Sequence, residues 1–310
     1  MKIYTDNTEF AKNYFENPLT FSKFSTADKR NNYSDKIQQI LDTEDYYLSE
    51  IDDYHGWQHI VFKEFSSTSQ FDMLIELSKS NTMPDRLICQ AGSGKKFHGF
   101  RNRPWESLPG NLHLAAFFAP KQEIPNFATG FLILAAVSVF QTIESFPELK
   151  GKAKFKWVND IVVGSSKVCG VIAQTQVMGN EISGAVMGIG LNVEAAPMVE
   201  PTAFVAKSSC LNDFSSIFIT QKEVFDKLLF FLNINYKNLL RGNYRELLEI
   251  YRNNSLIIGK EVKIWSDEQN GDNSIIHKGK VIKIGENLEL YLEGQKTAIV
   301  RGRLSLAENH

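Results

Sequence analysis

The stretch FKWVNDIVVGSSKVCGVIAQTQVMGNEISGAVMGIGLNV, at residues 155–193, decides the fold class. It divides into three β-rich runs, at residues 155–163, 167–178 and 181–193. Gly179-Asn180 separates the last two runs, and both residue types tolerate the positive φ that a tight hairpin turn requires. The stretch therefore predicts successive strands of a meandering sheet.

Strand and helix patterns alternate on either side of this stretch. Strands are predicted at residues 59–65, 85–90 and 111–119, and helices at residues 71–80 and 126–146. Further helices are predicted within residues 221–251, and a short capped helix within residues 34–42. After residue 253 only short strands are expected, at residues 261–265, 279–284, 288–292 and 297–301.

These patterns predict an α+β protein. We expect an N-terminal extension of unknown role at residues 1–45, a mixed α/β central domain at residues 46–252, and a small C-terminal SH3-like β-barrel at residues 253–310. The chain has 310 residues, which is long enough for two domains and an extension.

Composition limits the classes of function. The net charge is −2, from 34 basic and 36 acidic residues, so no positive field attracts nucleic acid. Cys89, Cys169 and Cys210 are odd in number and far apart, which favours a reducing compartment, and a cytoplasmic location is expected. Polar residues interrupt the most apolar segment, 126–141, which predicts a core helix and no membrane association.

The first candidate site lies in the string KWVND at residues 156–160, followed by Lys167 and Gly170. This combination of residues suits anhydride chemistry, in which a carboxylate is joined to the α-phosphate of ATP and two anions are brought together. A lysine can stabilise the developing charge while Asp160 helps to hold Mg²⁺. The alternative is structural, with Asn159-Asp160 as a turn and Lys167 as a solvated strand end.

The second candidate is the segment QAGSGKKFHGFRNRPW at residues 90–105. Its glycines allow the backbone to approach a ligand closely, and its cations stand without any acid, which favours an anion. The cations are Lys95, Lys96, Arg101 and Arg103. The residue order excludes both a Walker loop and a GxGxxG dinucleotide turn. We expect a basic loop that closes over a phosphate, with an exposed hairpin tip as the alternative.

The third candidate is GIGLN at residues 188–192. Its two glycines would let a flat ring or a backbone lie close to the strand, and the Asn192 amide could recognise a base edge or a phosphate. On its own, a lone GxG favours a strand bulge over a ligand contact.

Together and in this order, these pieces resemble the biotin protein ligases over about residues 46–308. The resemblance rests on Ser67-Thr68, the Gln-Ala-Gly-x-Gly-basic loop ending at Trp105, Gly110-Asn111-Leu112, Lys156-Trp157-x-Asn159-Asp160, Lys167 with Gly170, Gly188-Ile189-Gly190-x-Asn192, and the tail at residues 302–306. It implies a catalytic domain of the biotin/lipoate ligase type followed by the small barrel. Residues 1–45 show no helix-turn-helix pattern, so a repressor role is not expected.

The resemblance also implies a role for each matched position. The biotin-binding residues would be Ser67, Thr68, Gln90, Gly92, Gly94 and Gly170. The catalytic residues at the carboxylate and acyl-phosphate would be Lys167, Lys95 and Arg103. The nucleotide-binding residues would be Trp105, Asn159, Asp160 and Asn192, with Asp160 also at Mg²⁺.

The implied reaction activates biotin with ATP and passes the biotinyl group to a lysine of a biotin carboxyl carrier domain, part of a biotin-dependent carboxylase. No enzyme nucleophile is required. A lipoate or octanoate ligase of the same fold is an alternative, because fold alone does not fix the acyl group. A protein that binds biotin or its adenylate without transfer is another. A homodimer is compatible with the sequence.

The basic loop departs from the family's usual Gly-Arg-Gly-Arg-x-Gly-Arg order. Ser93 and Lys95 stand where arginines are expected, and extra residues precede the tryptophan. When the loop is aligned forward from its start at Gln90, Lys95 is the cation at the adenylate. When it is aligned backward from Trp105, this role falls to His98, Arg101 and Arg103. A lysine lacks the bidentate fork of arginine, so the first alignment predicts looser retention of the adenylate.

Overall fold

The computed structural model describes residues 1–24, 33–80, 83–199, 207–266 and 274–307. Its large sheet contains β1 (Lys2–Thr5), β2 (Ser22–Phe24), β3 (Tyr46–Glu50), β4 (His59–Ser66), β5 (Leu87–Gly94), β6 (Leu112–Phe118), β7 (Ala153–Lys156), β8 (Asp160–Val163), β9 (Ser166–Met178) and β10 (Glu181–Leu191). A smaller sheet contains β11 (Glu261–Trp265), β12 (Ile275–Ile284), β13 (Leu290–Leu292) and β14 (Arg303–Leu306).

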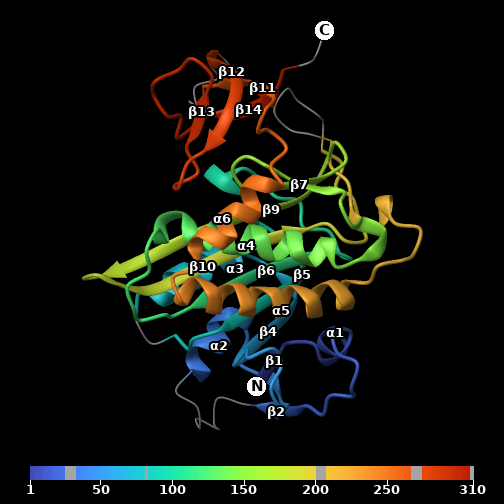
Figure 1. Cartoon of the computed structure of the whole chain (residues 1–310). Helices are drawn as coiled ribbons and strands as arrows, with labels where there is room; N and C mark the ends of the chain where they lie inside the picture. Colours follow the sequence, from blue (N-terminus) through green and yellow to red (C-terminus); the bar gives the residue numbers. More distant parts are fainter. Residues whose placement is uncertain (25–32, 81–82, 200–206, 267–273, 308–310) are drawn as a thin grey trace.

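Helices accompany these strands. They are α1 (Thr8–Lys12), α2 (Ser34–Leu41), α3 (Gln70–Ser78), α4 (Phe127–Glu144), α5 (Gln221–Leu240) and α6 (Tyr244–Asn253), with short 3-10 turns at Phe100–Asn102, Pro147–Leu149 and Leu211–Phe214. The large sheet runs in the order β2-β3-β1-β4-β5-β6-β10-β9-β8-β7, and the smaller sheet in the order β13-β12-β11-β14 (Figure 1). The mixed α/β fold class and the C-terminal β region are as predicted.

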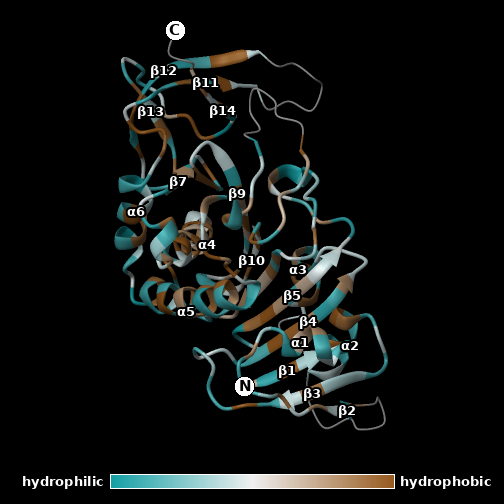
Figure 2. Cartoon of the chain, turned by 90° about the vertical axis from the view of Figure 1, so that its right-hand side faces the viewer, coloured by the Kyte–Doolittle hydropathy of each residue, from teal (hydrophilic) through white to brown (hydrophobic). Residues whose placement is uncertain are grey.

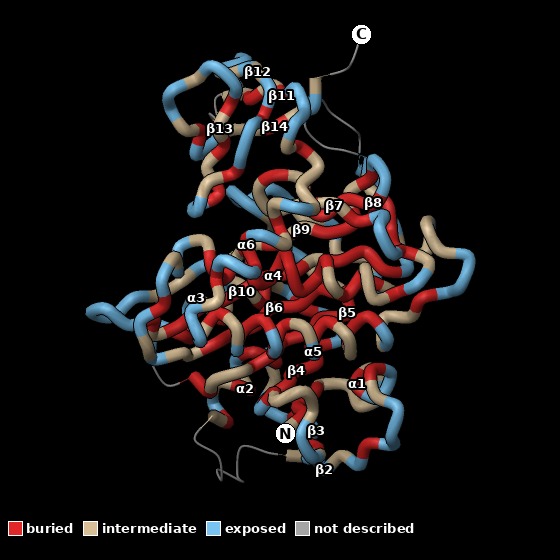
Figure 3. The backbone as a smooth tube through the Cα atoms, in the orientation of Figure 1, coloured by how far each residue is buried: buried red, intermediate tan, exposed pale blue. Residues whose placement is uncertain are grey.

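The large sheet has a different helix layer on each face because successive side chains of a strand point to opposite sides. On β4, Ile60 and Phe62 pack in the core cluster that contains α4 and α5, whereas Val61 packs with α2 and α3. Figure 2 shows α4 and α5 on one side of the sheet and α3 on the other. The central strands are buried on both faces, and Figure 3 shows this band of buried backbone through the middle of the molecule.

Helix α4 confirms the predicted core helix. It is long and apolar enough to cross a membrane, but 67% of it is buried inside the protein. A buried amide links it to α5: Asn235 Nδ2 donates to Ser138 Oγ at 2.9 Å and to Gln141 Oε1 at 2.7 Å. The apolar composition of this helix is therefore explained by burial between the sheet and α5.

Three strands of the first fifty residues, β1, β2 and β3, belong to the large sheet. Strand β1 pairs in parallel with β4 and antiparallel with β3, and Ile3 and Tyr4 are fully buried. Hydrophobic periodicity could not reveal strands this short, because a run of four residues contains only two full alternations. The predicted short helix within this segment is confirmed as α2, whose apolar face packs on the sheet.

Three other boundaries differ from the prediction. The run at residues 155–163 divides into β7 and β8, which pair as a hairpin around residues 157–159. Strand β5 continues to Gly94, so the start of the expected basic loop is part of the sheet. The strand predicted at residues 297–301 is wrong: Ile299 makes one isolated bridge with Leu290, and the last strand is β14.

Candidate active site

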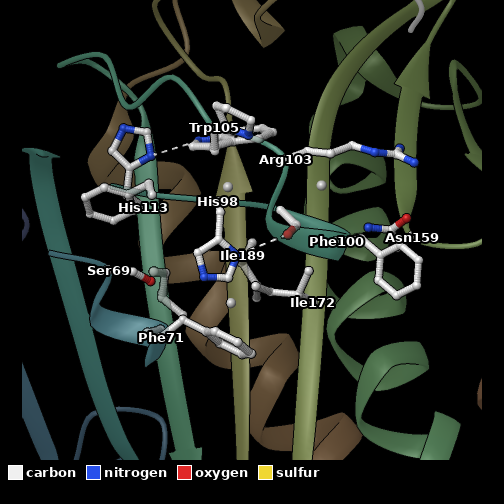
Figure 4. Close-up of a pocket in the computed structure, with 18 of the residues that line it drawn as sticks. Ser69, Phe71, His98, Phe100, Arg103, Trp105, His113, Asn159, Ile172 and Ile189 are labelled. Atoms are coloured by element: carbon white, nitrogen blue, oxygen red, sulfur yellow. Dashed lines mark hydrogen bonds between the residues drawn. The ribbon is translucent and has the colours of Figure 1, made fainter. Parts of the chain in front are cut away.

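A pocket lies on the α3 face of the sheet, over β10, β9 and β8. Its floor is flat where glycines replace side chains: Gly190 pairs with Gly170, and Gly188 makes room for its partner Ile172. Six residues to which the resemblance gave a role line the pocket: Arg103, Trp105, Asn159, Asp160, Lys167 and Gly170. His98, Gly188 and Gly190 from the candidate strings line it as well. Figure 4 shows the pocket between the loop that carries Trp105 and the start of α3 at Ser69 and Phe71.

Trp105 lies against this floor. A Cβ atom on Gly190 would overlap the Trp105 indole, and a Cβ on Gly170 would come within 3.4 Å of Trp105 Cζ3. The Trp105 ring also lies below the Lys167 ammonium, whose Nζ is 5.5 Å from the ring centroid. Gly190 is therefore required by the close approach of an aromatic ring. The strand bulge favoured for this string is wrong, because β10 pairs regularly with β9 from Gly188 to Gly190.

His113 holds the edge of Trp105 as a neutral acceptor. Trp105 Nε1 donates to His113 Nδ1 at 3.4 Å, and His113 Nε2 donates to the Leu108 carbonyl at 3.0 Å (Figure 4). Burial lowers the pKa of His113 to about 4. The imidazole is thus uncharged at neutral pH, with its proton on Nε2, and it can support Trp105 without adding charge to the pocket.

A cationic cluster forms where β7, β8 and β9 meet. Lys167 Nζ lies 2.7 Å from Asp160 Oδ1, and both side chains are about one quarter exposed, at 26% and 23%. Burial lowers the pKa of Lys156; Asp160 opposes this shift, while Lys167 and Arg103 add to it by charge repulsion. Lys167 and Arg103 line this end of the pocket with Asp160, and Lys156 lines the adjoining groove, so the charge here is positive and suited to phosphate.

The KWVND string produces this cluster through its local fold. Lys156 ends β7 and pairs with Asp160 at the start of β8, and residues 157–159 form the turn between them. The turn is anchored because Trp157 Nε1 donates to the Leu288 carbonyl at 2.7 Å. Asn159 Nδ2 donates to the Val171 carbonyl at 2.8 Å, which ties the turn to β9.

The basic loop folds over the pocket as a small hairpin of its own. The Gly99 amide donates to the Arg103 carbonyl at 2.8 Å, and the Trp105 amide donates to the Phe97 carbonyl at 2.9 Å. His98 Nε2 joins the loop to α3 through Asp72, at 2.8 Å. Burial disfavours the charged imidazolium, but hydrogen bonds to Asp72 and the Gly99 carbonyl outweigh burial and raise the pKa of His98.

The loop places the candidate cations differently. His98 and Arg103 line the pocket, and Arg101 lies in the neighbouring groove between the loop, β8 and the C-terminal sheet. Lys95 is exposed outside the pocket, where its backbone amide donates to the Ser66 carbonyl at 2.9 Å. The alignment counted back from Trp105 therefore agrees better with this arrangement than the alignment counted forward.

Several predicted biotin contacts lie beside the pocket and do not line it. Ser67 is exposed in the turn before α3, and Thr68 is half-buried next to it. Gly92 and Gly94 lie in β5, where a Cβ atom would collide with the backbone of β4 in both cases. These glycines are explained by close strand packing, and biotin contacts at all four positions stay predictions.

Gln90 points to the opposite face of the sheet. Its Nε2 donates to the Tyr14 hydroxyl at 3.3 Å and to the Ala91 carbonyl at 2.7 Å, and Tyr14 packs against Phe62 and Phe225. Alternation along β5 therefore places this amide in the α5 layer. Gln90 does not line the pocket, so its contact with biotin stays a prediction.

Asn192 is fully buried and acts on the site through the backbone. Its Nδ2 donates to the Ser209 carbonyl at 3.0 Å and to Ser208 Oγ at 3.3 Å. Ser209 in turn donates its amide to the Lys167 carbonyl at 3.0 Å. Asn192 thus helps to position the strand end that carries Lys167, and direct contact with the nucleotide stays a prediction.

Sequence reasoning did not select several pocket residues. These include Ser69, Gln70, Phe71, His113 and Ile172. Ser69 caps α3 by accepting the Asp72 amide, which its place before a helix could have indicated. The others carry no local signal, because their side chains meet only through strand register and the docking of α3.

The described residues contain no group of three or more histidine, cysteine, aspartate or glutamate side chains that could hold a metal ion. Asp160 is the carboxylate that lines the pocket, and it is paired with Lys167. The site therefore offers one carboxylate, Asp160, next to the cations Lys167 and Arg103. Mg²⁺ commonly binds in this way, through one or two carboxylates together with phosphates and water.

Comparison with known proteins adds to this picture. Residues 63–192 match the model of the biotin/lipoate A/B protein ligase family. The chain is similar to the bifunctional ligase/repressor BirA of Bacillus subtilis (strain 168), at 24% identity over 208 residues that cover 66% of this chain and 62% of that protein. The aligned part thus spans less than two thirds of that relative's length.

Solved structures share the fold. The biotin protein ligase from Aquifex aeolicus in complex with biotin and ATP matches with a TM-score of 0.62 at 20% identity, covering 82% of this chain and all of that one. The biotin protein ligase from Leishmania major in complex with biotin matches with a TM-score of 0.52 at 14% identity, covering 81% of this chain and 98% of that one. At these identities the likeness shows the fold alone.

Proposed function

We propose, on the premise that residues 63–192 form a domain of the biotin/lipoate A/B protein ligase family, that this chain is a biotin protein ligase. It would activate biotin with ATP to biotinyl-AMP and transfer the biotinyl group to a lysine of a biotin carboxyl carrier domain. The observation that carries this proposal is the Lys167–Asp160 pair beside a flat glycine floor and Trp105. Such a site can accept an aromatic base and neutralise phosphate.

In the first step, a carboxylate oxygen of biotin attacks the α-phosphorus of ATP. The new oxygen–phosphorus bond forms as the bond from the α-phosphorus to pyrophosphate breaks. Lys167, Lys156 and Arg103 would stabilise the negative charge that develops, because they are fixed in place before the reaction begins. Trp105 would pack on adenine.

In the second step, the amine of the carrier lysine attacks the acyl carbon of biotinyl-AMP. An amide bond forms, the bond between the acyl carbon and the AMP oxygen breaks, and the amine loses its proton. AMP is a good leaving group, so the enzyme needs to position the two reactants and requires no nucleophile of its own. The loop at residues 97–105 would keep water from the adenylate until the carrier arrives.

ATP and Mg²⁺ would bind at the cationic end of the pocket. Asp160 would hold Mg²⁺ together with the nucleotide phosphates, and the metal would neutralise phosphate charge. Asn159 and Asn192 would support the nucleotide, and Ser67, Thr68, Gly92 and Gly94 would complete the biotin site as the family match suggests. The three cysteines are free and buried, which supports our proposal of a cytoplasmic location.

The test is a direct assay for the intermediate. The full chain is incubated with ATP, Mg²⁺ and labelled biotin, and biotinyl-AMP is sought by chromatography and mass spectrometry, with biotin-dependent exchange of labelled pyrophosphate into ATP as the kinetic readout. Binding of biotin without any biotin-dependent pyrophosphate exchange would favour a binding protein. Exchange with lipoate or octanoate instead of biotin would favour the alternative acyl ligase.

A further inference from the structure

Gln70 is a buried amide without partners inside the pocket. It is the first residue of α3, it is 1% exposed, and it lines the pocket with Ser69 and Phe71. Neither its Nε2 nor its Oε1 makes a hydrogen bond to any described residue. Both halves of the amide are therefore removed from water and unsatisfied.

This arrangement is unfavourable for the protein alone. A buried polar group that loses water without gaining a partner destabilises the folded state, and most such groups in proteins are paired. The same chain pairs other buried amides: Asn235 makes two hydrogen bonds, and Asn192 bonds with its neighbours on both halves of its amide. Among the described residues, Ser34, Arg86 and Gln90 each leave one buried polar atom without a hydrogen bond, whereas Gln70 leaves both halves of its amide unpaired. An amide that is wholly unpaired and lines a pocket points to a ligand.

The surroundings of Gln70 indicate which part of a ligand it would meet. Phe71 packs over Gly188, at 3.2 Å from the position of an ideal Cβ atom, and Ala115 and Ile172 complete an apolar wall. Figure 4 shows Ser69 and Phe71 on the opposite side of the pocket from Arg103 and Asn159. Gln70 therefore belongs to the end of the pocket remote from Arg103. The nearby His98 is paired with Asp72, so an uncharged head group fits there.

We propose that Gln70 recognises the head group of the substrate and selects a cyclic urea over an acyl chain without hydrogen-bonding groups. A primary amide has a donor and an acceptor side by side, and a cyclic urea presents the complementary N–H and C=O. This inference rests on the proposed function, since biotin carries such a urea whereas lipoate and octanoate do not. For those two acids the amide would stay unsatisfied, which disfavours their binding.

The test compares the full chain with its Gln70→Met variant, which keeps the side-chain length and removes both polar groups. Binding of biotin, lipoate and octanoate is measured by calorimetry in the absence of ATP. We expect the affinity for biotin to fall about 10- to 1,000-fold, since two hydrogen bonds in a dry site are lost. The affinities for lipoate and octanoate should stay equal or rise. Unchanged affinity for biotin would overturn the inference.

Thermal unfolding separates recognition from a structural role. Because Gln70 is unsatisfied without ligand, the variant should unfold at the same or a higher temperature than the parent chain. A clear decrease would show that the amide supports the fold, which would also overturn the inference. Gln176→Met is the matched control: Gln176 Nε2 donates to the Ile75 carbonyl at 3.2 Å and to Ser78 Oγ at 2.7 Å, so its loss should destabilise the protein and leave biotin affinity unchanged.

Pyrophosphate exchange on the parent chain distinguishes this inference from the proposed function. If biotin binds the parent chain and not Gln70→Met, but the parent shows no pyrophosphate exchange, the assignment of Gln70 to the head group stands and the proposed ligase activity is refuted. If the parent exchanges pyrophosphate with biotin and the variant does so with the same KM, the ligase activity stands and the assignment to Gln70 falls. If biotin does not bind the parent at all, the assignment is refuted.

Discussion

Replacing Lys167 by methionine should greatly slow adenylate formation and leave the fold intact. Lys167 Nζ is 2.7 Å from Asp160 Oδ1, and the cluster around this pair has two further cations, Arg103 in the pocket and Lys156 in the adjoining groove. The substitution lowers the net charge of this cluster from +2 to +1 and leaves Asp160 without its lysine partner. The nucleotide phosphates would therefore meet a weaker positive field and a carboxylate that repels them.

The expected magnitude follows from the electrostatics of the site. Two unit charges about 4 Å apart interact by about 4 kcal/mol at an effective dielectric constant of about 20. Removing one fixed stabiliser of transition-state charge typically costs about 2.7–4 kcal/mol, or about 10²- to 10³-fold in rate. Lys156 and Arg103 remain in place, so we expect a decrease of about 10²- to 10³-fold in kcat/KM.

Stability should change little. The Lys167–Asp160 pair is only about one quarter exposed on both sides but lines the pocket, so we expect its loss to cost about 1–2 kcal/mol, between the values for exposed and for buried pairs. Methionine keeps most of the apolar stem of lysine, so we expect Tm to fall by no more than about 4 °C. Tm is measured by calorimetry on the same preparation as the activity.

The assay is biotin-dependent pyrophosphate exchange, with Lys154→Met as the control. Lys154 lies on β7 outside the pocket, so its loss removes the same charge from a position where no substrate is expected. A double-mutant cycle with Asp160→Asn measures the coupling of the pair, which we expect to be about 1–2 kcal/mol. Exchange by Lys167→Met within twofold of the parent would refute the role assigned to Lys167.

Three further predictions follow from other parts of the structure. Gly190→Ala should weaken ATP binding at least about tenfold, since the added methyl would overlap Trp105; calorimetric titration measures this, and unchanged affinity would contradict the packing argument. The His98–Asp72 contact should hold the loop best below the ordinary histidine pKa and weaken as pH rises through the raised pKa of His98. Hydrogen exchange of residues 97–105 should report this loosening, and Asp72→Asn should abolish its pH dependence. Ile3→Ala should lower the free energy of unfolding by about 2–4 kcal/mol, measured with urea, because the side chain is fully buried; a change as small as that of exposed Lys12→Ala would exclude β1 from the stable core.

The order of elements in the central domain could be predicted with good accuracy from pattern alone. Strands β4, β6, β9 and β10 and helices α3 and α4 all lie within one or two residues of their predicted bounds. These elements are long, and their side chains repeat with the period of the structure that they form. The short strands β1 and β2 contain too few residues for such a signal, so the N-terminal segment could be assigned only when its pairing with β4 was seen.

The candidate site was predicted in part. The KWVND string and the glycine pair at residues 188–190 concern residues that are close in sequence, and strand pairing brings them together as expected. The basic loop could be aligned in two ways, and its hairpin bonds now place Arg103 in the pocket and Lys95 outside it. Gln90 matched the motif but points to the opposite face, because the side chain of a strand residue alternates whatever its chemistry.

The sequence by itself determined the fold class, the family resemblance and the chemical character of the site, because these depend on residue type and local spacing. Only the tertiary structure decided which side chains share the pocket. The pairing of Lys167 with Asp160, the support of Trp105 by His113, and the unsatisfied amide of Gln70 all depend on strand register and on how α3 and the loop dock. The physical reason is that burial and hydrogen-bond satisfaction are properties of surroundings, and the surroundings of a residue come from distant parts of the chain.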